Sequence, residues 1–482
     1  MLFNSLQFAV FFPIVTLLYF LLGKKWRVPM LLAASCMFYM AFVPKYILIL
    51  FALIVVDFTA GILIESSDGR RRKIYLVASL CANIGMLGFF KYFNFFNANL
   101  SELAHWIGWN YPVSALSIIL PIGLSFHTFQ SMSYTIEVYR GNFKAERSIL
   151  HFALYVLFYP QLVAGPIERP QNLLHQFYED HRFEWPRVCS GLKLMAAGLF
   201  KKIIIADRVA VLVNEVYKHP QDYSGLQLLI ATYFFAIQIY CDFSGYSDIA
   251  RGAARVMGIE LMLNFNRPYL AANLVDFWRR WHISLSTWFR DYLYVPMGGN
   301  RVPAGRIYFN LAVVFLVSGF WHGANWTYVV WGAAHAAGFI LCLATRDLRQ
   351  KVAGALGIRD SLFTKAAGMF VTFNFVCLTW VFFRASNITS AFRIIGRILS
   401  DCSHGAMLPP GLSAPEFITA LALIFCLLFL EGLTRHPPPW LVAATGFRWV
   451  RWSGYYIFCV IFILLFLLSP RRAAQTFIYF QF

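Results

Sequence analysis

The chain has 482 residues, of which 59% are hydrophobic and only 13% are charged. A soluble domain carries about a quarter charged residues because water must solvate its surface, so this composition excludes an ordinary soluble protein. The formal net charge of +18 fits the lysine and arginine excess at the cytoplasmic ends of membrane helices, with a lipid bilayer as partner and no nucleic acid.

Apolar stretches recur along the whole chain. A helix needs about 20 mostly apolar residues to cross a hydrocarbon core of about 30 Å. We therefore expect roughly ten to thirteen membrane-embedded helices, some of them re-entrant. The purest stretches are residues 5–23, 46–64, 225–243, 417–433 and 455–468.

Basic residues cluster just beyond two of the early apolar stretches. Lys24, Lys25 and Arg27 form the first cluster, and residues 70–73, Arg-Arg-Arg-Lys, form the second. Two spans separate the clusters, so both lie on one side of the membrane. The positive-inside rule assigns that side to the cytoplasm.

No internal repeat, low-complexity tract or soluble domain interrupts the chain, which predicts a single membrane domain over residues 1–482. Some polar residues lie inside otherwise apolar regions, and Asp242 in the motif CDFSGYSD is the clearest example. Such a carboxylate can line an interior cavity. Hydrogen bonding between membrane helices is the alternative explanation.

The segment over residues 276–301 differs from an ordinary span. It reads DFWRRWHISLSTWFRDYLYVPMGGNR and combines many aromatic residues with a high density of charge. Such charge is too costly for hydrocarbon but can lie at the interface or line a water-filled cavity. The pattern predicts an amphipathic interfacial or re-entrant helix pair, followed by a turn at Gly298, Gly299 and Asn300.

A second unusual segment, SGFWHGANWTYVVWGAAHA, covers residues 318–336 and joins two apolar helices. His322 lies near the expected break between them. Gly319, Gly323 and Ala324 flank it, and such small residues let a substrate or a backbone approach closely. His335 lies in the helical stretch that follows, where it either bonds between helices or lines a pocket.

A histidine inside a membrane protein is costly unless it is hydrogen-bonded or used, so His282 and His322 are functional candidates. From spacing alone, a buried and hydrogen-bonded imidazole near a helix end is the favoured explanation for His322. No GxSxG nucleophile motif accompanies it. An imidazole without its own nucleophile suits a general base that takes a proton from a hydroxyl attacking an acyl carbon.

Six motifs, taken together and in order, resemble the membrane-bound O-acyltransferase family. The resemblance is strongest to its bacterial polysaccharide branch, which is typified by the alginate O-acetyltransferase and related to the D-alanyl transfer protein of teichoic acid synthesis. The motifs are PIGLSFHTFQSMSYTIEVYRG, YPQLVAGPIERP, IQIYCDFSGYSDIARG, LNFNRPYLAANLVDFWRRWHISLSTWFRDYLYVPMGGNR, FLVSGFWHGANWTYVVWGAAHA and WVFFRA.

The resemblance implies an all-α polytopic fold, with a helical bundle and re-entrant helices around a central funnel or tunnel. It implies a multi-pass protein of the bacterial inner membrane. The hallmark histidine of the family corresponds to His322, and the second characteristic position corresponds to His282. We expect both to be catalytic.

The implied reaction takes an acetyl group from a cytoplasmic thioester, acetyl-CoA or an acyl-carrier thioester, with no metal and no tightly bound cofactor. The acetyl group would cross the membrane for O-acetylation of an exported, alginate-like polysaccharide through a periplasmic acetyltransferase partner. His322 would act as general base, and His282 would orient the donor or stabilise the oxyanion. Further pocket residues are expected to be Arg279, Arg280 and Arg290 at the donor phosphates, Trp278, Trp281, Trp321 and Trp326 as apolar walls, and Asn325, Asp242 and His335.

Other functions remain as alternatives. The acceptor could be a lipid or another cell-envelope glycan, since the amphipathic segment does not distinguish them. A transporter should show repeated halves with paired broken helices, and the sequence has none. A structural subunit would have little use for two histidines beside helix breaks.

Overall fold

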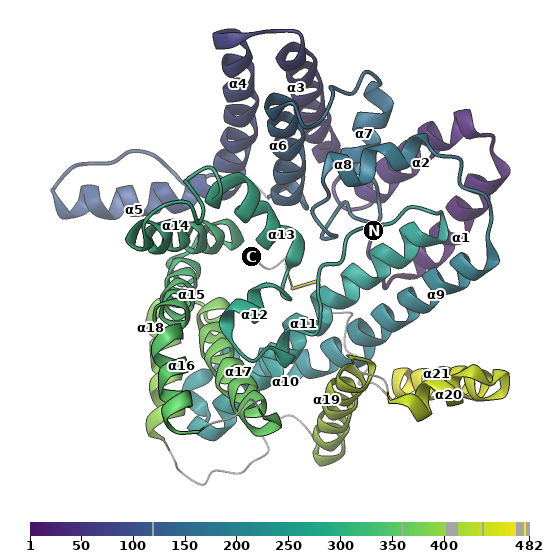
Figure 1. The fold of residues 1–482 in the computed structure, drawn as a ribbon. Helices are drawn as coiled ribbons and strands as arrows, with labels where there is room; N and C mark the ends of the chain where they lie inside the picture. The colour runs from purple at the N-terminus through teal and green to yellow at the C-terminus, as the bar shows by residue number, and fades with distance from the viewer. Residues whose placement is uncertain (118–119, 358–360, 402–412, 436–437, 469–476, 479–482) are drawn as a thin grey trace.

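The computed structural model describes residues 1–117, 120–357, 361–401, 413–435, 438–468 and 477–478, and every regular element within them is a helix (Figure 1). Eight helices are long and apolar enough to cross a membrane, and Leu6–Leu21 is a shorter apolar helix. The chain is therefore an all-α, multi-pass membrane protein, as predicted. The expected ten to thirteen embedded helices also counted shorter segments. The eight are Pro44–Glu65, Gly69–Trp106, Gly225–Val256, Ala304–His322, Trp326–Ala344, Leu362–Arg384, Ala414–Leu433 and Arg448–Leu467.

The N-terminal helices pack through buried polar side chains. Asp57 Oδ1 accepts hydrogen bonds from Ser79 Oγ at 2.7 Å and from Asn83 Nδ2 at 2.9 Å. Ser79 Oγ also lies 3.2 Å from Thr135 Oγ1. Bonds of this kind hold membrane helices together where lipid offers no partner. The helices of this part are α1 (Leu6–Leu21), α2 (Lys24–Met40), α3 (Ile47–Glu65), α4 (Gly69–Leu87), α6 (Leu124–Arg140) and α7 (Ile149–Leu157), with α3, α4 and α6 together at the top of Figure 1.

The longest helix, α11 (Gly225–Val256), runs through the centre of the molecule beside α9 (Trp185–Leu199) (Figure 1). The two backbones touch at glycines. A Cβ atom added at Gly198 would lie 2.5 Å from the carbonyl oxygen of Gly245, and one added at Gly252 would lie 2.5 Å from that of Gly191. Only glycine permits this approach, which packs α9 firmly against α11. After α9 the chain continues through a π-helical segment, Phe200–Ala206, into α10 (Asp207–Lys218).

The segment over residues 276–301 is a series of short helices near the centre of the molecule (Figure 1). It comprises α12 (Leu274–Trp278), α13 (Ile283–Phe289) and a π-helical turn, Arg290–Tyr294. Gly298 and Gly299 follow with φ of 108° and 55°, values that favour glycine. The predicted helix pair and the predicted glycine turn are therefore both present.

Helices α14 (Ala304–His322) and α15 (Trp326–Ala344) form a closely packed pair. A Cβ atom at Gly319 would lie 2.3 Å from the carbonyl oxygen of Tyr328, and one at Gly332 would lie 2.4 Å from that of Phe315. The helical backbone is interrupted between His322 and Trp326, where the sequence predicted a break between two helices.

The remaining helices surround this centre. A π-helical segment, Gly88–Tyr92, joins α4 to α5 (Phe93–Trp106), which projects sideways from the bundle (Figure 1). Helices α17 (Leu362–Arg384) and α18 (Ile388–Ser400) pack against α11 and α15. The others are α8 (Pro170–Leu173), α16 (Arg346–Ala355), α19 (Ala414–Arg435), α20 (Pro439–Gly446) and α21 (Arg448–Leu467).

Candidate active site

His322 is the last residue of α14, and its side chain is buried. Aromatic rings surround the imidazole: its centroid lies 5.0 Å from that of Trp321, 5.2 Å from that of Trp331 and 5.3 Å from that of Phe383. The rings come from three helices, α14, α15 and α17. The imidazole therefore lies where these helices meet, shielded from water.

His282 lies between α12 and α13 in an unusual backbone conformation. Its φ is +42°, which a residue other than glycine adopts only when its surroundings hold it there. Asn264 provides that constraint. Its carbonyl oxygen accepts from the Ile283 N–H at 2.9 Å, and its side-chain Oδ1 lies 3.1 Å from His282 Nδ1. Burial lowers the pKa of His282 to about 3, so its imidazole is neutral near pH 7.

The contacts of Asn264 also identify the tautomer of His282. Asn264 Oδ1 accepts from Ser284 Oγ at 2.9 Å and from the Ser284 N–H at 3.3 Å, so it is an acceptor. His282 Nδ1 must then carry the proton that points toward it. In that tautomer Nε2 has a lone pair and accepts hydrogen bonds.

An indole lies between the two histidines. The Trp321 ring centroid is 6.3 Å from that of His282 and 5.0 Å from that of His322. A second indole, that of Trp331, lies 5.2 Å from His322 and 4.8 Å from His335. His335 is buried, and its Nε2 lies 2.9 Å from Thr379 Oγ1. The fold thus gathers all three histidines around one aromatic cluster.

Two side chains from the π-helical segment before α5 hold the end of α14. Lys91 Nζ donates to the carbonyl oxygens of Trp321 at 2.6 Å and His322 at 3.0 Å. Tyr92 Oη donates to that of Phe320 at 3.1 Å. The last carbonyls of a helix lack partners within it, and a cation stabilises that negative end. These contacts fix the position of His322.

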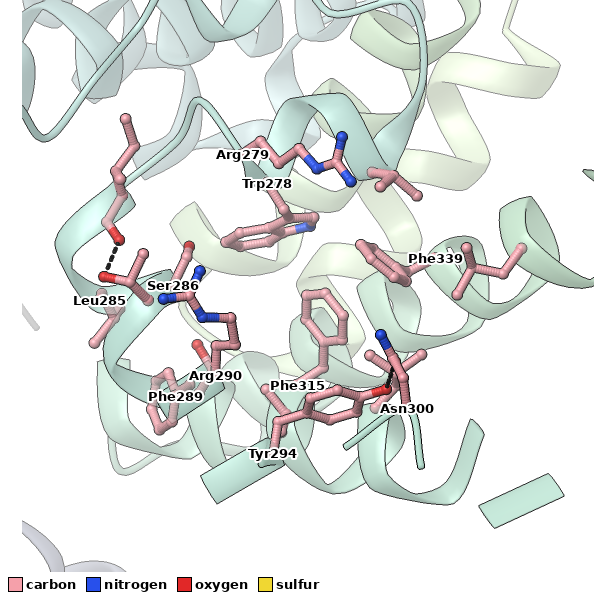
Figure 2. A pocket seen from close by; sticks show the side chains of 17 residues that line it. Trp278, Arg279, Leu285, Ser286, Phe289, Arg290, Tyr294, Asn300, Phe315 and Phe339 are labelled. Atoms are coloured by element: carbon pink, nitrogen blue, oxygen red, sulfur yellow. Dashed lines mark hydrogen bonds between the residues drawn. The ribbon is translucent and has the colours of Figure 1, made fainter. Parts of the chain in front are cut away.

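A cavity of about 550 Å³, here called the Trp278 cavity, lies beside α14 (Figure 2). Its lining is mostly apolar, and Ser318 on the turn of α14 before His322 contributes to it. Figure 2 shows the indole of Trp278 and the rings of Phe315 and Phe339 around the space, bordered by the guanidinium groups of Arg279 and Arg290.

A second cavity of about 490 Å³, here called the Lys91 cavity, lies beside the C-terminal end of α14. Gly323, the residue after His322, lines it, and so does Phe383, whose ring packs on the imidazole. Its lining is polar in character. The side chains that make it so are those of Lys91, Asn325, Thr327, Tyr328, Arg384 and Ser386.

The predicted site residues divide between the site and the surrounding packing. Those at the site are His282, His322, Trp278, Arg279, Arg290, Trp321, Asn325 and His335. Trp278 lines its cavity and packs on His335 at 5.0 Å. Asn325 lines the Lys91 cavity and caps α15, since its Oδ1 accepts from the Thr327 N–H at 3.0 Å.

Four predicted residues belong to the surrounding packing. Arg280 pairs with Asp276 at 2.8 Å, and Trp281 packs in the core 5.1 Å from Trp380. Trp326 is 51% exposed and bonds to Asn99. Asp242 pairs with Lys202 at 2.6 Å and accepts a hydrogen bond from the Ile478 N–H. Trp281 and Trp326, which we expected as walls of the site, line neither of the two cavities.

Sequence reasoning missed three residues that shape the site: Asn264, Lys91 and Arg384. Lys91 had a signal, because a lysine within an apolar run is a functional candidate by default. Asn264 and Arg384 lie inside two of the motifs, in LNFNRPYL and WVFFRA, but their neighbours in sequence do not indicate their contacts.

Known proteins are similar to this chain along most of its length. Residues 144–383 match the sequence model of the membrane-bound O-acyltransferase family. A peptidoglycan O-acetyltransferase of Helicobacter pylori is 34% identical over 428 residues, covering 82% of this chain and 79% of that protein. A probable alginate O-acetylase, AlgI, of Pseudomonas aeruginosa is 38% identical over 405 residues, covering 83% and 75%. A teichoic acid D-alanyltransferase of Streptococcus thermophilus is 30% identical over 290 residues, covering 55% and 69%.

Proposed function

This chain belongs to the membrane-bound O-acyltransferase family and is an acyltransferase, and we propose that it moves an acetyl group from a cytoplasmic thioester to a hydroxyl reached from the outer side of the membrane. The acceptor would be an exported polysaccharide of the alginate type, and the membrane would be the bacterial inner membrane. Peptidoglycan, which the Helicobacter pylori relative is named for, makes another cell-envelope glycan the second candidate acceptor.

One observation carries the proposal: residues that precede and follow His322 in the chain line two different cavities. Ser318, before it on α14, lines the Trp278 cavity, and Gly323, after it, lines the Lys91 cavity. A donor in one cavity and an acceptor in the other would meet at the imidazole. Holding both reactants in place supplies much of the rate enhancement of a group transfer.

The position of the second basic cluster, residues 70–73, indicates which cavity faces the cytoplasm. Arg72 in the second basic cluster donates to the carbonyl oxygen of Val138, and Arg140 donates to that of Asp291. Asp291 lies between Arg290 and Tyr294, which both line the Trp278 cavity. The positive-inside rule then places this cavity on the cytoplasmic side, where the thioester donor would enter.

Arg279 and Arg290 border the Trp278 cavity and suit the phosphates of acetyl-CoA, since a guanidinium group binds phosphate with paired donors. The apolar interior suits the arm that carries the thioester. An acyl-carrier thioester would present the same arm.

The chemistry follows from the position of His322. Its imidazole takes the proton of the acceptor hydroxyl while the oxygen attacks the thioester carbonyl carbon. The tetrahedral intermediate collapses as the C–S bond breaks, and the departing thiolate takes the proton from the imidazolium. The surrounding rings of Trp321, Trp331 and Phe383 exclude water, which limits hydrolysis of the thioester.

The tautomer of His282 narrows its role. With Nδ1–H directed at Asn264 and a pKa of about 3, the imidazole has no second proton to donate to an oxyanion. It can instead accept a hydrogen bond through Nε2, for example from an amide N–H on the arm of the donor. We therefore assign His282 to orienting the donor.

Replacing Asn264 with alanine tests this assignment. The buried Nδ1–H of His282 would lose its acceptor, which costs about 1–3 kcal/mol. We expect a lower melting temperature and a raised KM for the thioester donor. Asn266→Ala, an exposed amide in the same segment, is the matched control. A loss of stability with an unchanged KM would make Asn264 purely structural.

A separate partner would hold the polymer and present its hydroxyl at the Lys91 cavity. The described residues contain no outer domain large enough to hold a polysaccharide, since every one of their elements belongs to the helical bundle or its edge. A periplasmic acetyltransferase is the partner that this arrangement favours.

Proteoliposomes with one protein orientation test the proposed direction of transfer. Labelled acetyl-CoA is supplied either at the face of the Trp278 cavity or at the opposite face, and its consumption is measured with a soluble glycan acceptor and the periplasmic partner present. We expect consumption only from the first side. Arg290→Gln should raise the KM for acetyl-CoA, whereas Arg306→Gln, an exposed arginine that lines neither cavity, should not. Equal consumption from both sides would contradict the assignment.

A further inference from the structure

We propose that the Lys91 cavity is an acceptor subsite that binds an anionic group, a carboxylate or a phosphate, carried by the glycan next to the reacting hydroxyl. This inference rests on the proposed acyl transfer and adds the charge of the acceptor to it. It depends on two cationic side chains that have no acidic partner among the described residues.

The first cation is Lys91. Its ammonium group gives two hydrogen bonds to the carbonyl oxygens of Trp321 and His322, and an ammonium group has three to give. The side chain lines the cavity at the end of α14. One donor therefore remains for a ligand beside the His322 backbone.

The second cation is Arg384, the last residue of α17. Its Nη2 donates to Asn214 Oδ1 at 2.9 Å, and its guanidinium carbon lies 5.7 Å from the centroid of the Tyr217 ring. Both of these contacts are to uncharged groups. The guanidinium group retains a planar set of donors that matches a carboxylate or a phosphate.

Two lysines in the interior are paired with acids. Lys201 lies 3.0 Å from Asp248, and Lys202 lies 2.6 Å from Asp242. Across the residues that the structure describes, no carboxylate pairs with Lys91 or Arg384. The carbonyl groups at the end of α14 offset part of the charge of Lys91, but Arg384 has no comparable compensation. A partly buried charge is costly unless it is paired, so the cavity favours an anionic occupant.

The rest of the cavity suits a sugar. Asn325, Thr327 and Ser386 contribute amide and hydroxyl groups, and Ser386 is exposed at the edge. A sugar ring with an anion held by the two cations would present a hydroxyl toward Gly323 and the adjacent His322. The Trp278 cavity has a mostly apolar lining, so the two cavities would select different reactants.

Binding can be measured without turnover. The purified protein is heated with a uronic acid hexasaccharide, with a glycerol phosphate oligomer or with a neutral hexasaccharide, all at one ionic strength, and its melting temperature is followed by tryptophan fluorescence. A ligand that binds only the folded state raises this temperature. We expect the uronate, the phosphate oligomer or both to raise it, and the neutral sugar to leave it unchanged. The difference between the two charged oligomers identifies the source of the anion.

Arg384→Gln should weaken binding of the charged oligomer by about tenfold or more, because hydrogen bonds to a charged group are lost. Arg384→Lys keeps the charge without the planar donors and should have an intermediate effect. Arg393→Gln removes an exposed arginine from α18 and is the matched control for the net charge. It should leave binding unchanged.

The outcomes separate the two proposals. The anionic subsite would be overturned by no rise with either charged oligomer, by an equal rise with the neutral sugar, or by an equal loss of binding in Arg393→Gln. His322→Ala should still bind the charged oligomer. The proposed reaction, and not the subsite, would be refuted if the wild type transfers no acetyl group while its binding of the charged oligomer still depends on Arg384.

Discussion

Replacement of His322 by alanine is expected to lower the rate of acetyl transfer by about 10²–10⁴-fold, the range that a general base contributes. Among the described residues, His322 is the histidine whose neighbours in the chain line both cavities, so we expect no other group to replace it as the base. The measurement is the initial rate of label transfer from acetyl-CoA in proteoliposomes, at equal amounts of folded protein.

His105→Ala is the matched control, because His105 is exposed on α5. Added imidazole should restore part of the rate in His322→Ala, since it can enter the space that the side chain leaves. A purely structural histidine would lower the melting temperature without this rescue. A mutant that transfers at the wild-type rate would show that His322 is not the base.

Replacement of Gly332 by alanine is the second large effect that we expect. The new Cβ atom would lie 2.4 Å from the carbonyl oxygen of Phe315, so α14 and α15 must move apart. Overpacking of this kind costs about 1–3 kcal/mol. Because α14 carries His322 and α15 carries Trp331, a shift of about 1 Å should also lower the transfer rate by about 10²-fold. Melting temperature and initial rate are the measurements.

Gly305→Ala on the same helix pair is the control. A Cβ atom at Gly305 meets nothing within 4 Å, and alanine is a better helix former than glycine. We expect this variant to be as stable as the wild type or slightly more so, with normal activity. If Gly332→Ala behaves in the same way, the close approach of α14 and α15 does not position His322.

The membrane helices and their breaks could be predicted because they depend on local sequence. Apolar length gave the spans, and small residues around His322 gave the break between α14 and α15. The glycine turn at Gly298 and Gly299 followed from the same kind of signal. Periodic apolar length is a strong signal because a membrane helix must satisfy its own backbone hydrogen bonds.

The composition of the site could be predicted only in part, because tertiary contacts decide it. The motif around His282 contains several tryptophans and arginines, and the sequence does not indicate which of these side chains line the cavity. Trp278 and Arg290 line it, whereas Trp281 packs in the core and Arg280 pairs with Asp276. The polar partners come from remote segments: Lys91 lies far from His322 in the chain, and its contact depends on how α4 and α5 join.

The proposed placement of the donor in the Trp278 cavity and the acceptor in the Lys91 cavity determines how the reaction relates to the membrane potential. In each turnover the acetyl group leaves as the equivalent of an acylium cation, and the acceptor proton moves in the opposite direction to the thiol. The two charges are equal and cross in opposite directions, so the exchange is electroneutral. A potential of 100 mV, which does about 2.3 kcal/mol of work on one elementary charge, therefore leaves the equilibrium unchanged. The thioester bond alone would supply the free energy, so the extent of transfer at equilibrium is expected to be the same in a de-energised vesicle as in an energised one.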